Sequence, residues 1–346
     1  MNQKIFTLIL FIILVLLSIV SLFIGAININ FIDIIKGNSE HIDIWFLSRF
    51  PRLLAIICTG VGMSIAGIIM QQLCMNKFVS PSTSSTISSA QLGILLAMVF
   101  FPKATLTEKL SFSFVTSIIG TYIFIFFMQN IKYKDIIMVP LVGIMFGNII
   151  GGITSFISYR YDLIQAMNSF IVGDFSLIIK GNYEIVFLII PLVVIAYIFS
   201  NHFNIVGMGE DFSKNLGVNY NIILVGGLSI SALITASVVV TVGTIPYIGL
   251  IIPNIVSIFK GDKLKENIID TALVGAIFVL LCDIIGRLII FPYEIPVNLI
   301  VGVLGSILFI CLLYYKIKPS KIDKKVSSEN IVDKSFKSKG GYCCEK

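Results

Sequence analysis

Charged residues are scarce in this sequence, and their scarcity excludes most soluble proteins. Only 13% of the 346 residues are Asp, Glu, Lys or Arg, whereas 57% are hydrophobic, and the mean hydropathy is +0.99. A soluble domain carries about 25% charged residues. The composition therefore predicts an integral membrane protein.

The motifs of catalysis and nucleotide binding are also missing. The sequence contains neither GxSxG nor HExxH, and it has no GxxxxGK[ST] loop that would hold the phosphates of a nucleotide. Its two histidines, His41 and His202, lie apart from any cluster with metal-ligand spacing. We therefore expect that this chain is not an enzyme and that it binds no metal and no cofactor.

Long apolar runs make up most of the chain. A membrane-spanning helix needs about 20 mainly apolar residues, and the runs predict an all-α, polytopic membrane protein with about ten transmembrane helices. The runs are continuous, whereas a β-barrel would show alternating segments of about ten residues. The eighth run is short and is interrupted by Pro246 and Pro253. The ten predicted helices cover approximately residues 5–27, 49–71, 86–101, 110–130, 136–158, 183–200, 219–241, 246–259, 267–290 and 296–315.

The first run is expected to remain as a span, because it is too long for a signal peptide and lacks a small-x-small cleavage site. Ten spans place both termini on one side of the membrane. If that side is the cytoplasm, 17 of the 25 Lys and Arg residues lie inside and 8 lie outside, which the positive-inside rule favours. We predict a transmembrane domain over residues 1–316 and a basic, disordered cytoplasmic tail over residues 317–346.

Cysteine usage gives no sign of a disulfide framework. The six cysteines lie outside the predicted outer loops, and the C-terminal CCEK lacks the aliphatic pair of a prenylation motif. They are Cys58, Cys74, Cys282, Cys311, Cys343 and Cys344.

Two features inside the predicted spans have both a structural and a functional interpretation. Gly143, Gly147 and Gly151 are spaced by four, so they share one helix face, where a neighbouring backbone can approach closely. This face either packs against a neighbouring helix in the ordinary way or belongs to a helix that lines a path or a subunit interface. Asp283 and Arg287, at i and i+4, can form an intramembrane pair, which is more often structural than a proton relay.

Two further features lie between the spans. Arg49 and Arg52 precede the second run on the predicted outer side, where they either anchor lipid phosphates or dock an acidic partner. Residues 207–221, GMGEDFSKNLGVNYN, predict a short charged helix. Glu210 and Asp211 suit a helix N-terminus and Gly217 suits the position after its end.

Four stretches resemble the iron-siderophore and cobalamin class of ABC-importer permeases (FecCD-like). RFPRLLAIICTGVGMSIAGIIMQQLCMNKFVSP is similar to its R-hydrophobic-PR opening, its Gly/Ala-rich span and its NPLASP. GMGEDFSKNLGVN, GTIPYIGLIIPNIV and DIIGRLIIFPYEIPVNLIVGVLGSILFICLL follow in the family's order. The resemblance covers residues 1 to about 316.

This chain departs from the family's pattern at four positions. Lys77 stands where the family usually has Pro, Asn254 where it often has His, Asn298 where it often has Gly, and Ser306 where it often has Pro. These departures keep the class and bear on substrate identity. The NKFVSP variant resembles the catecholate or petrobactin branch.

The resemblance implies a permease subunit in the cell membrane, with both termini cytoplasmic. Its implied partners are a second permease, identical or similar, two cytoplasmic ATPase subunits that bind ATP and Mg, and an extracytoplasmic substrate-binding protein. The implied cargo is a ferric siderophore, and no nucleic acid is expected. The alternatives are the same fold carrying cobalamin or haem, or a secondary transporter driven by an ion gradient that uses Asp283.

The resemblance also implies roles for particular residues. Asn76 and Phe78 fall where the family places a cytoplasmic gate, and Arg49, Arg52 and Arg287 should meet the binding protein at one outer rim. Residues 207–221 correspond to the family's coupling helix, which fits a groove of the ATPase. The implied coupling residues are Gly209, Glu210, Asp211, Phe212, Leu216 and Gly217.

Overall fold

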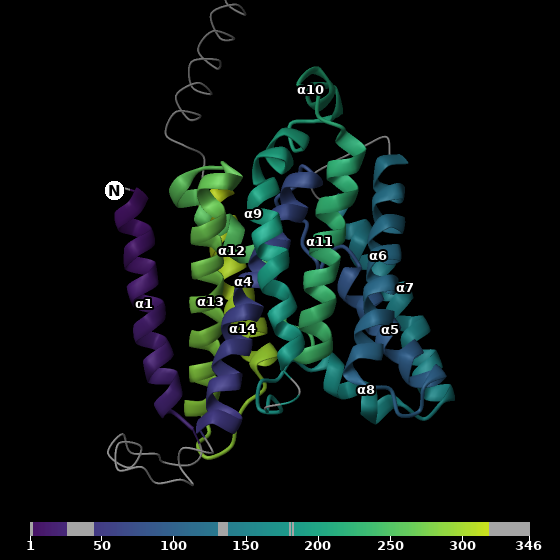
Figure 1. Cartoon of the computed structure of the whole chain (residues 1–346), viewed down its shortest axis with the longest axis vertical. Coiled ribbons are helices and arrows are strands. Elements are labelled where there is room, and N and C mark those ends of the chain that lie inside the picture. The colour runs from purple at the N-terminus through teal and green to yellow at the C-terminus, as the bar shows by residue number, and fades with distance from the viewer. Residues whose placement is uncertain (1–2, 26–44, 131–137, 180, 182, 318–346) are drawn as a thin grey trace, which may run out of the picture. The chain divides into compact units, whose positions relative to one another are not determined.

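The computed structural model describes residues 3–25, 45–130, 138–179, 181 and 183–317. Within these ranges the chain is helical and contains no strand (Figure 1). Its helices are α1 Gln3–Phe23, α4 Phe50–Leu73, α5 Thr86–Phe100, α6 Leu106–Asn130, α7 Met138–Arg160, α8 Ile164–Ile171, α9 Ile189–Val206, α10 Glu210–Asn215, α11 Tyr220–Thr241, α12 Ile248–Lys260, α13 Leu264–Leu288 and α14 Val297–Ile317. The all-α, polytopic prediction is confirmed.

Ten apolar helices occupy the positions of the ten predicted spans. In the described part of the chain, eight helices are long and apolar enough to cross a membrane, and α5 and α12 are shorter apolar helices. The count of about ten therefore combines eight full-length spans with two short ones. α12 has only 13 residues and contains Pro253, which accounts for the weak eighth run in the sequence.

The contacts divide the chain into two units, residues 1–305 and 306–346. In the second unit the structure describes only the final part of α14, which remains helical to Ile317. The predicted tail at 317–346, with Cys343 and Cys344, lies almost wholly outside the described residues, and so does His41. The division of domains at residue 316 therefore stays a prediction.

α4 lies at the centre of the first unit. It packs against α9, α11, α12 and α13, and 72% of its most apolar window is buried, whereas the figure is 28% for α6 and for α7. α4 can be surrounded because glycine and alanine line it. A Cβ atom on Gly67 would lie 2.0 Å from the carbonyl oxygen of Gly249 on α12, so these two helices touch through their backbones.

α1 is attached to the rest of the unit by polar contacts. Only 6% of its most apolar window is buried, and it packs mainly against α13. The Thr7 hydroxyl donates to Asp270 Oδ1 on α13 (2.7 Å), and Asp270 also pairs with Lys260. At its other end, α1 accepts hydrogen bonds from two arginines described below.

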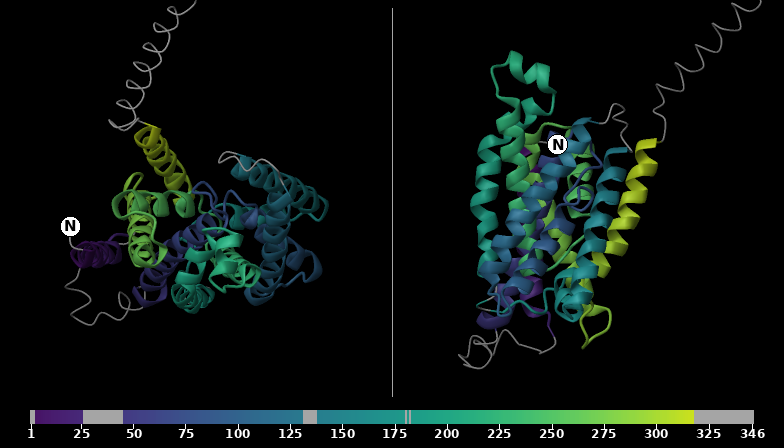
Figure 2. Two further views of the ribbon diagram at one scale, coloured as in Figure 1. Left: turned by 90° about the horizontal axis from the view of Figure 1, so that it is seen from above. Right: turned by 90° about the vertical axis from the view of Figure 1, so that its right-hand side faces the viewer.

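The long helices run between two opposite ends of the bundle, and each end carries one short helix, α10 or α8 (Figures 1 and 2). The α10 end carries α10, the segment 74–85 after α4, and the turn between α12 and α13. The α8 end carries α8, the N-terminus of α4 and the turn between α13 and α14. The candidate functional residues gather at these two ends.

Candidate functional site

α10 is a short helix whose two ends are fixed by glycines. It follows Gly209 (φ +111°), and the chain leaves it through Gly217 (φ +72°). The Gly217 amide donates to the carbonyl of Lys214, and the Val218 amide donates to the carbonyl of Ser213, both at 3.0 Å. This pair of bonds is a Schellman motif, which requires a left-handed residue at this position. The structure therefore places Gly217 after the end of the helix, where the sequence predicted it.

α10 presents apolar side chains on its outer surface. Phe212 is 47% exposed and Leu216 is 55% exposed, and Met208, just before the helix, is 58% exposed. Glu210 forms an ion pair with Lys214 at 2.8 Å, and this hydrogen-bonded contact raises the pKa of Lys214. A short helix with an apolar edge and a charged flank fits a groove on a partner protein. Met208 was not among the predicted coupling residues, because it lies before the start of the helix.

The segment between α4 and α5, residues 74–85, is called the gate loop after the role that the family resemblance implies for Asn76 and Phe78. Asn76 is buried (6% exposed), and its Oδ1 accepts a hydrogen bond from the amide of Phe78 (2.9 Å). Before the loop, the Gln71 side-chain amide donates to the carbonyls of Gly249 and Leu250 on α12 at 3.1 and 3.2 Å. The gate loop is thus braced by its own Asn76 side chain, and the end of α4 that leads into it is bonded to α12.

A cavity of about 440 Å³ lies between the gate loop and the base of α10. Gln72, Asn76 and Asp262 are among its polar lining residues, and Met208 is among its apolar ones. The cavity therefore touches the gate loop, the connection into α10 and the α12–α13 turn together.

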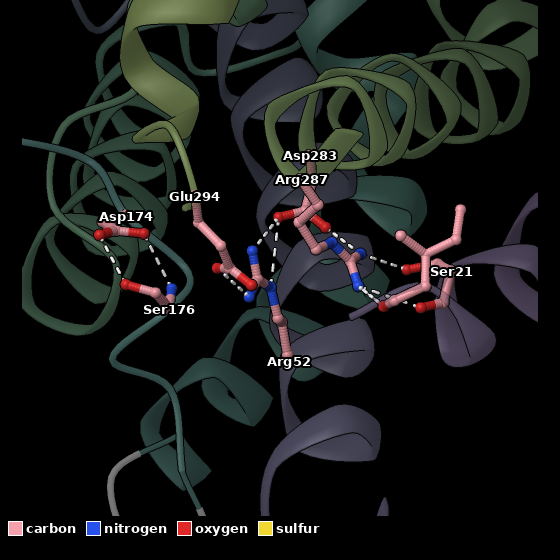
Figure 3. Close-up of polar contacts among 8 residues, drawn as sticks. Ser21, Arg52, Asp174, Ser176, Asp283, Arg287 and Glu294 are labelled. Atoms are coloured by element: carbon pink, nitrogen blue, oxygen red, sulfur yellow. Dashed lines mark hydrogen bonds and ion pairs between the residues drawn. The ribbon is translucent and has the colours of Figure 1, made fainter. Parts of the chain in front are cut away.

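A network of charged residues forms at the α8 end (Figure 3). Asp283 on α13 is 2% exposed and accepts from two arginines. Arg52 Nη2 lies 2.7 Å from Asp283 Oδ1, and Arg287 pairs with Asp283 Oδ2 one helical turn away. Arg52 Nη1 also lies 2.6 Å from Glu294 Oε2, in the turn before α14. Each buried charge therefore has a partner of opposite sign, as burial in a membrane protein requires.

Two arginines bind the C-terminal end of α1. Arg287 Nη1 donates to the carbonyls of Ser21 (3.0 Å) and Ile24 (2.7 Å), and its Nη2 donates to the Ser21 hydroxyl (2.6 Å). Arg49 Nη1 donates to the carbonyls of Leu22 and Phe23 at 2.7 and 3.2 Å. The last carbonyls of a helix have no partner within the helix and carry partial negative charge, so cations are favoured there.

This geometry revises the expected arrangement of the three arginines. Arg49, Arg52 and Arg287 do gather at one end, but they do not all face water. Arg287 is only 6% exposed, because Asp283 and the end of α1 surround it, and two carboxylates neutralise Arg52. Arg49 is half-buried, so part of its side chain reaches the surface at this end.

The three glycines of α7 do not all pack against the same element. A Cβ atom on Gly143 would lie 2.0 Å from the carbonyl oxygen of Thr83 in the gate loop, and one on Gly147 would lie 3.3 Å from the Ser88 hydroxyl. Around Gly151 the described residues leave open space within 4 Å. Gly143 and Gly147 therefore let the gate loop and α5 pack closely against α7, while Gly151 faces open space.

The described residues contain no group of three His, Cys, Asp or Glu side chains that could hold a metal. The cysteines within the described ranges, Cys58, Cys74, Cys282 and Cys311, are free thiols.

A bundle of apolar helices, with an exposed apolar short helix at one end and paired charges at the other, is the architecture of an integral membrane protein that presents a surface to a partner. The model of the FecCD transport family matches residues 12–315. The chain belongs to the FecCD transport family, whose members are transport permeases.

Two relatives show how close the similarity is. The chain is 48% identical over 304 residues to the petrobactin import system permease protein YclN of Bacillus subtilis (strain 168), covering 88% of this chain and 96% of that protein. It is 36% identical to the ferric-anguibactin transport system permease protein FatD of Vibrio anguillarum, covering 85% and 93%.

A solved structure has the same fold. It is described as an inward-facing conformation of a metal-chelate type ABC transporter, and it matches with a TM-score of 0.75 and 22% identity over 90% of this chain and 99% of that chain.

Proposed function

We propose that this chain is the permease subunit of an ABC importer for a ferric siderophore of the petrobactin type. The 48% identity to a petrobactin import permease over 96% of its length supports the siderophore class and suggests petrobactin itself as the first cargo to test. The chain would work in the cell membrane as one of two permeases, with both termini in the cytoplasm. It would bind no cofactor, because ATP and Mg would be held by two partner ATPase subunits.

The observation that carries this proposal is the exposed edge of α10. Phe212 and Leu216 lie on a helix whose ends are set by Gly209 and Gly217, and a groove on an ATPase subunit would bury both side chains. The α10 end would then face the cytoplasm. The gate loop with Asn76 and Phe78 would lie at the cytoplasmic mouth, and Gly151 would lie on a face of α7 that lines the path or the permease interface.

The ion-gradient alternative has less support from the geometry. A proton- or sodium-binding carboxylate needs a lone pair that is open to the ion. Asp283 uses both oxygens to pair with Arg52 and Arg287, so its place in the network is structural.

The test is uptake by the reconstituted complex. We expect ferric petrobactin to enter proteoliposomes only when permease, ATPase, binding protein and ATP are all present, and ferric petrobactin to be preferred over cobalamin and haem. Uptake by the permease alone under a proton or sodium gradient would contradict the proposal. Equal uptake of cobalamin or haem would overturn the assignment of the cargo.

Docking of the binding protein gives a second prediction. Arg49→Glu should slow association of the binding protein with the complex in nanodiscs, because an acidic docking surface on the binding protein would meet a carboxylate in place of a guanidinium. The defect should shrink as salt rises. Arg49 is the suitable position, because Arg52→Glu would place a third carboxylate beside Asp283 and Glu294. Lys103→Glu, an exposed position after α5, is the matched control. Equal association rates for wild type and Arg49→Glu at low salt would contradict a docking role. Arg49 would then serve to hold the end of α1 or to bind lipid headgroups.

A further inference from the structure

Two of the positions at which this chain departs from its family's sequence pattern meet in space. Lys77 belongs to the gate loop and Asn254 belongs to α12, 177 residues later. Asn254 is 5% exposed, and its side-chain amide donates to the carbonyl of Lys77 (2.8 Å) and to that of Leu250 (2.7 Å). The backbone of the gate loop is therefore held at residue 77 by a buried side chain.

The side chain of Lys77 continues this connection to the next turn. Its Nζ lies 2.6 and 2.7 Å from the two carboxylate oxygens of Asp262, between α12 and α13, and 3.2 Å from the Ser257 hydroxyl. Ser257 in turn donates to Asp262. One residue of the gate loop thus contacts both α12 and the α12–α13 turn.

The two contacts differ in strength. The side chains of Lys77 and Asp262 are 40% and 62% exposed, and an exposed ion pair changes an equilibrium by at most about fivefold. The Asn254 side chain is buried, and breaking its bond to Lys77 would take this donor from a partly buried carbonyl, which costs more than losing an exposed ion pair. The ion pair can therefore open and close during a working cycle while the Asn254 bond keeps the loop in place.

The cavity links this pair to α10. Lys77 and Asp262 line it, and so do Gly207 and Met208 at the base of α10. A displacement of α10 by a partner would change the shape of this cavity and so the surroundings of the pair.

We propose that Lys77 and Asp262 form a latch, hinged on the Asn254–Lys77 hydrogen bond, that holds the gate loop against the α12–α13 turn until α10 is moved. Lys77 and Asp262 are then positioning residues for transport, and Asn254 is the hinge. This proposal rests on the proposed function, because it assigns the motion of α10 to a partner ATPase.

The experiment measures the gate loop directly. In a variant that lacks the native cysteines, Phe78→Cys reports access to the loop through its rate of reaction with a membrane-impermeant thiol reagent. Asp262→Lys and Lys77→Asp should each raise this rate by up to about fivefold in the nucleotide-free complex. Each should also raise the amount of ATP hydrolysed per siderophore imported. The double variant Lys77→Asp with Asp262→Lys should return both values toward wild type.

The matched control is Glu266→Lys. Glu266, in the first turn of α13, pairs at 3.1 Å with Lys263, the residue that precedes this helix. The same charge reversal four residues from Asp262 should leave both values at the wild-type level.

Unchanged thiol reactivity in both single variants, no recovery in the double variant, or an equal effect of Glu266→Lys would each overturn the latch. The thiol reaction needs no cargo, so it tests the latch even if ferric petrobactin is not imported. Absence of ATP-dependent uptake by the wild type would count against the proposed function alone.

Discussion

Asp283→Ala is expected to destabilise the protein more than any other single change in the network at the α8 end. Removing one partner of a buried ion pair costs about 3–5 kcal/mol, because the remaining charge stays buried without compensation. Here two guanidinium groups, those of Arg52 and Arg287, would lose the carboxylate that they share. Thermal unfolding in nanodiscs should show a large fall in the midpoint temperature, with low yields of folded protein.

Glu294→Gln provides the comparison within the same network. The Glu294 side chain is 25% exposed and forms an ion pair with Arg52. Arg52 would keep its contact with Asp283, so a cost of about 1 kcal/mol or less is expected. Equal midpoints for Asp283→Ala and wild type would show that Asp283 does not stabilise the fold. Loss of ion-driven uptake in Asp283→Ala with unchanged stability would favour the ion-gradient alternative.

Gly217→Val should abolish most ATP-dependent uptake. Gly217 has φ +72°, and left-handed backbone costs an ordinary residue about 1–2 kcal/mol, with β-branched residues the worst suited. α10 has only six residues and cannot be stable alone, so this cost is enough to disorder its end and to lower uptake by about tenfold. The described residues leave open space around Gly217 within 4 Å, so the effect comes from backbone conformation and not from a clash.

Gly217→Asn separates the conformational cause from the loss of a glycine. Asn tolerates the left-handed region far better than Val, so Gly217→Asn should retain most uptake at similar side-chain volume. The measurements are uptake and ATP hydrolysis by the assembled complex, with binding-protein docking expected to survive in both variants. Similar losses for Asn and Val would refute the conformational explanation, and wild-type uptake in Gly217→Val would contradict a coupling role for α10.

Much of the fold could be predicted from the sequence because membrane helices follow from local composition. The apolar runs located the ten apolar helices of the described residues to within a few residues at most ends. The exposed helix α10, Glu210–Asn215, followed from the placement of charges and glycines. α8 was missed, because eight residues of mixed polarity on the edge of a span carry too weak a signal.

The candidate site was less predictable because its contacts join distant parts of the chain. The i,i+4 spacing indicated the pair of Asp283 and Arg287, but Arg52 reaches Asp283 across 231 residues, and no local pattern could reveal that contact. The rule that disfavours outer arginines identified them as unusual. That rule says nothing of contacts made in the folded protein, where Glu294 neutralises Arg52 and the carbonyls at the end of α1 accept hydrogen bonds from Arg287.

The polar attachments of α1 have a consequence for the order of assembly during synthesis. Arg49 binds the C-terminal end of α1 from only 27 positions further along the chain, whereas Asp270 and Arg287 bind α1 from 263 and 266 positions further. Until α13 has been made, α1 can therefore be held only at its C-terminal end, beside the start of α4. The N-terminal half of α1, which contains Thr7, is fixed later by Asp270 of α13.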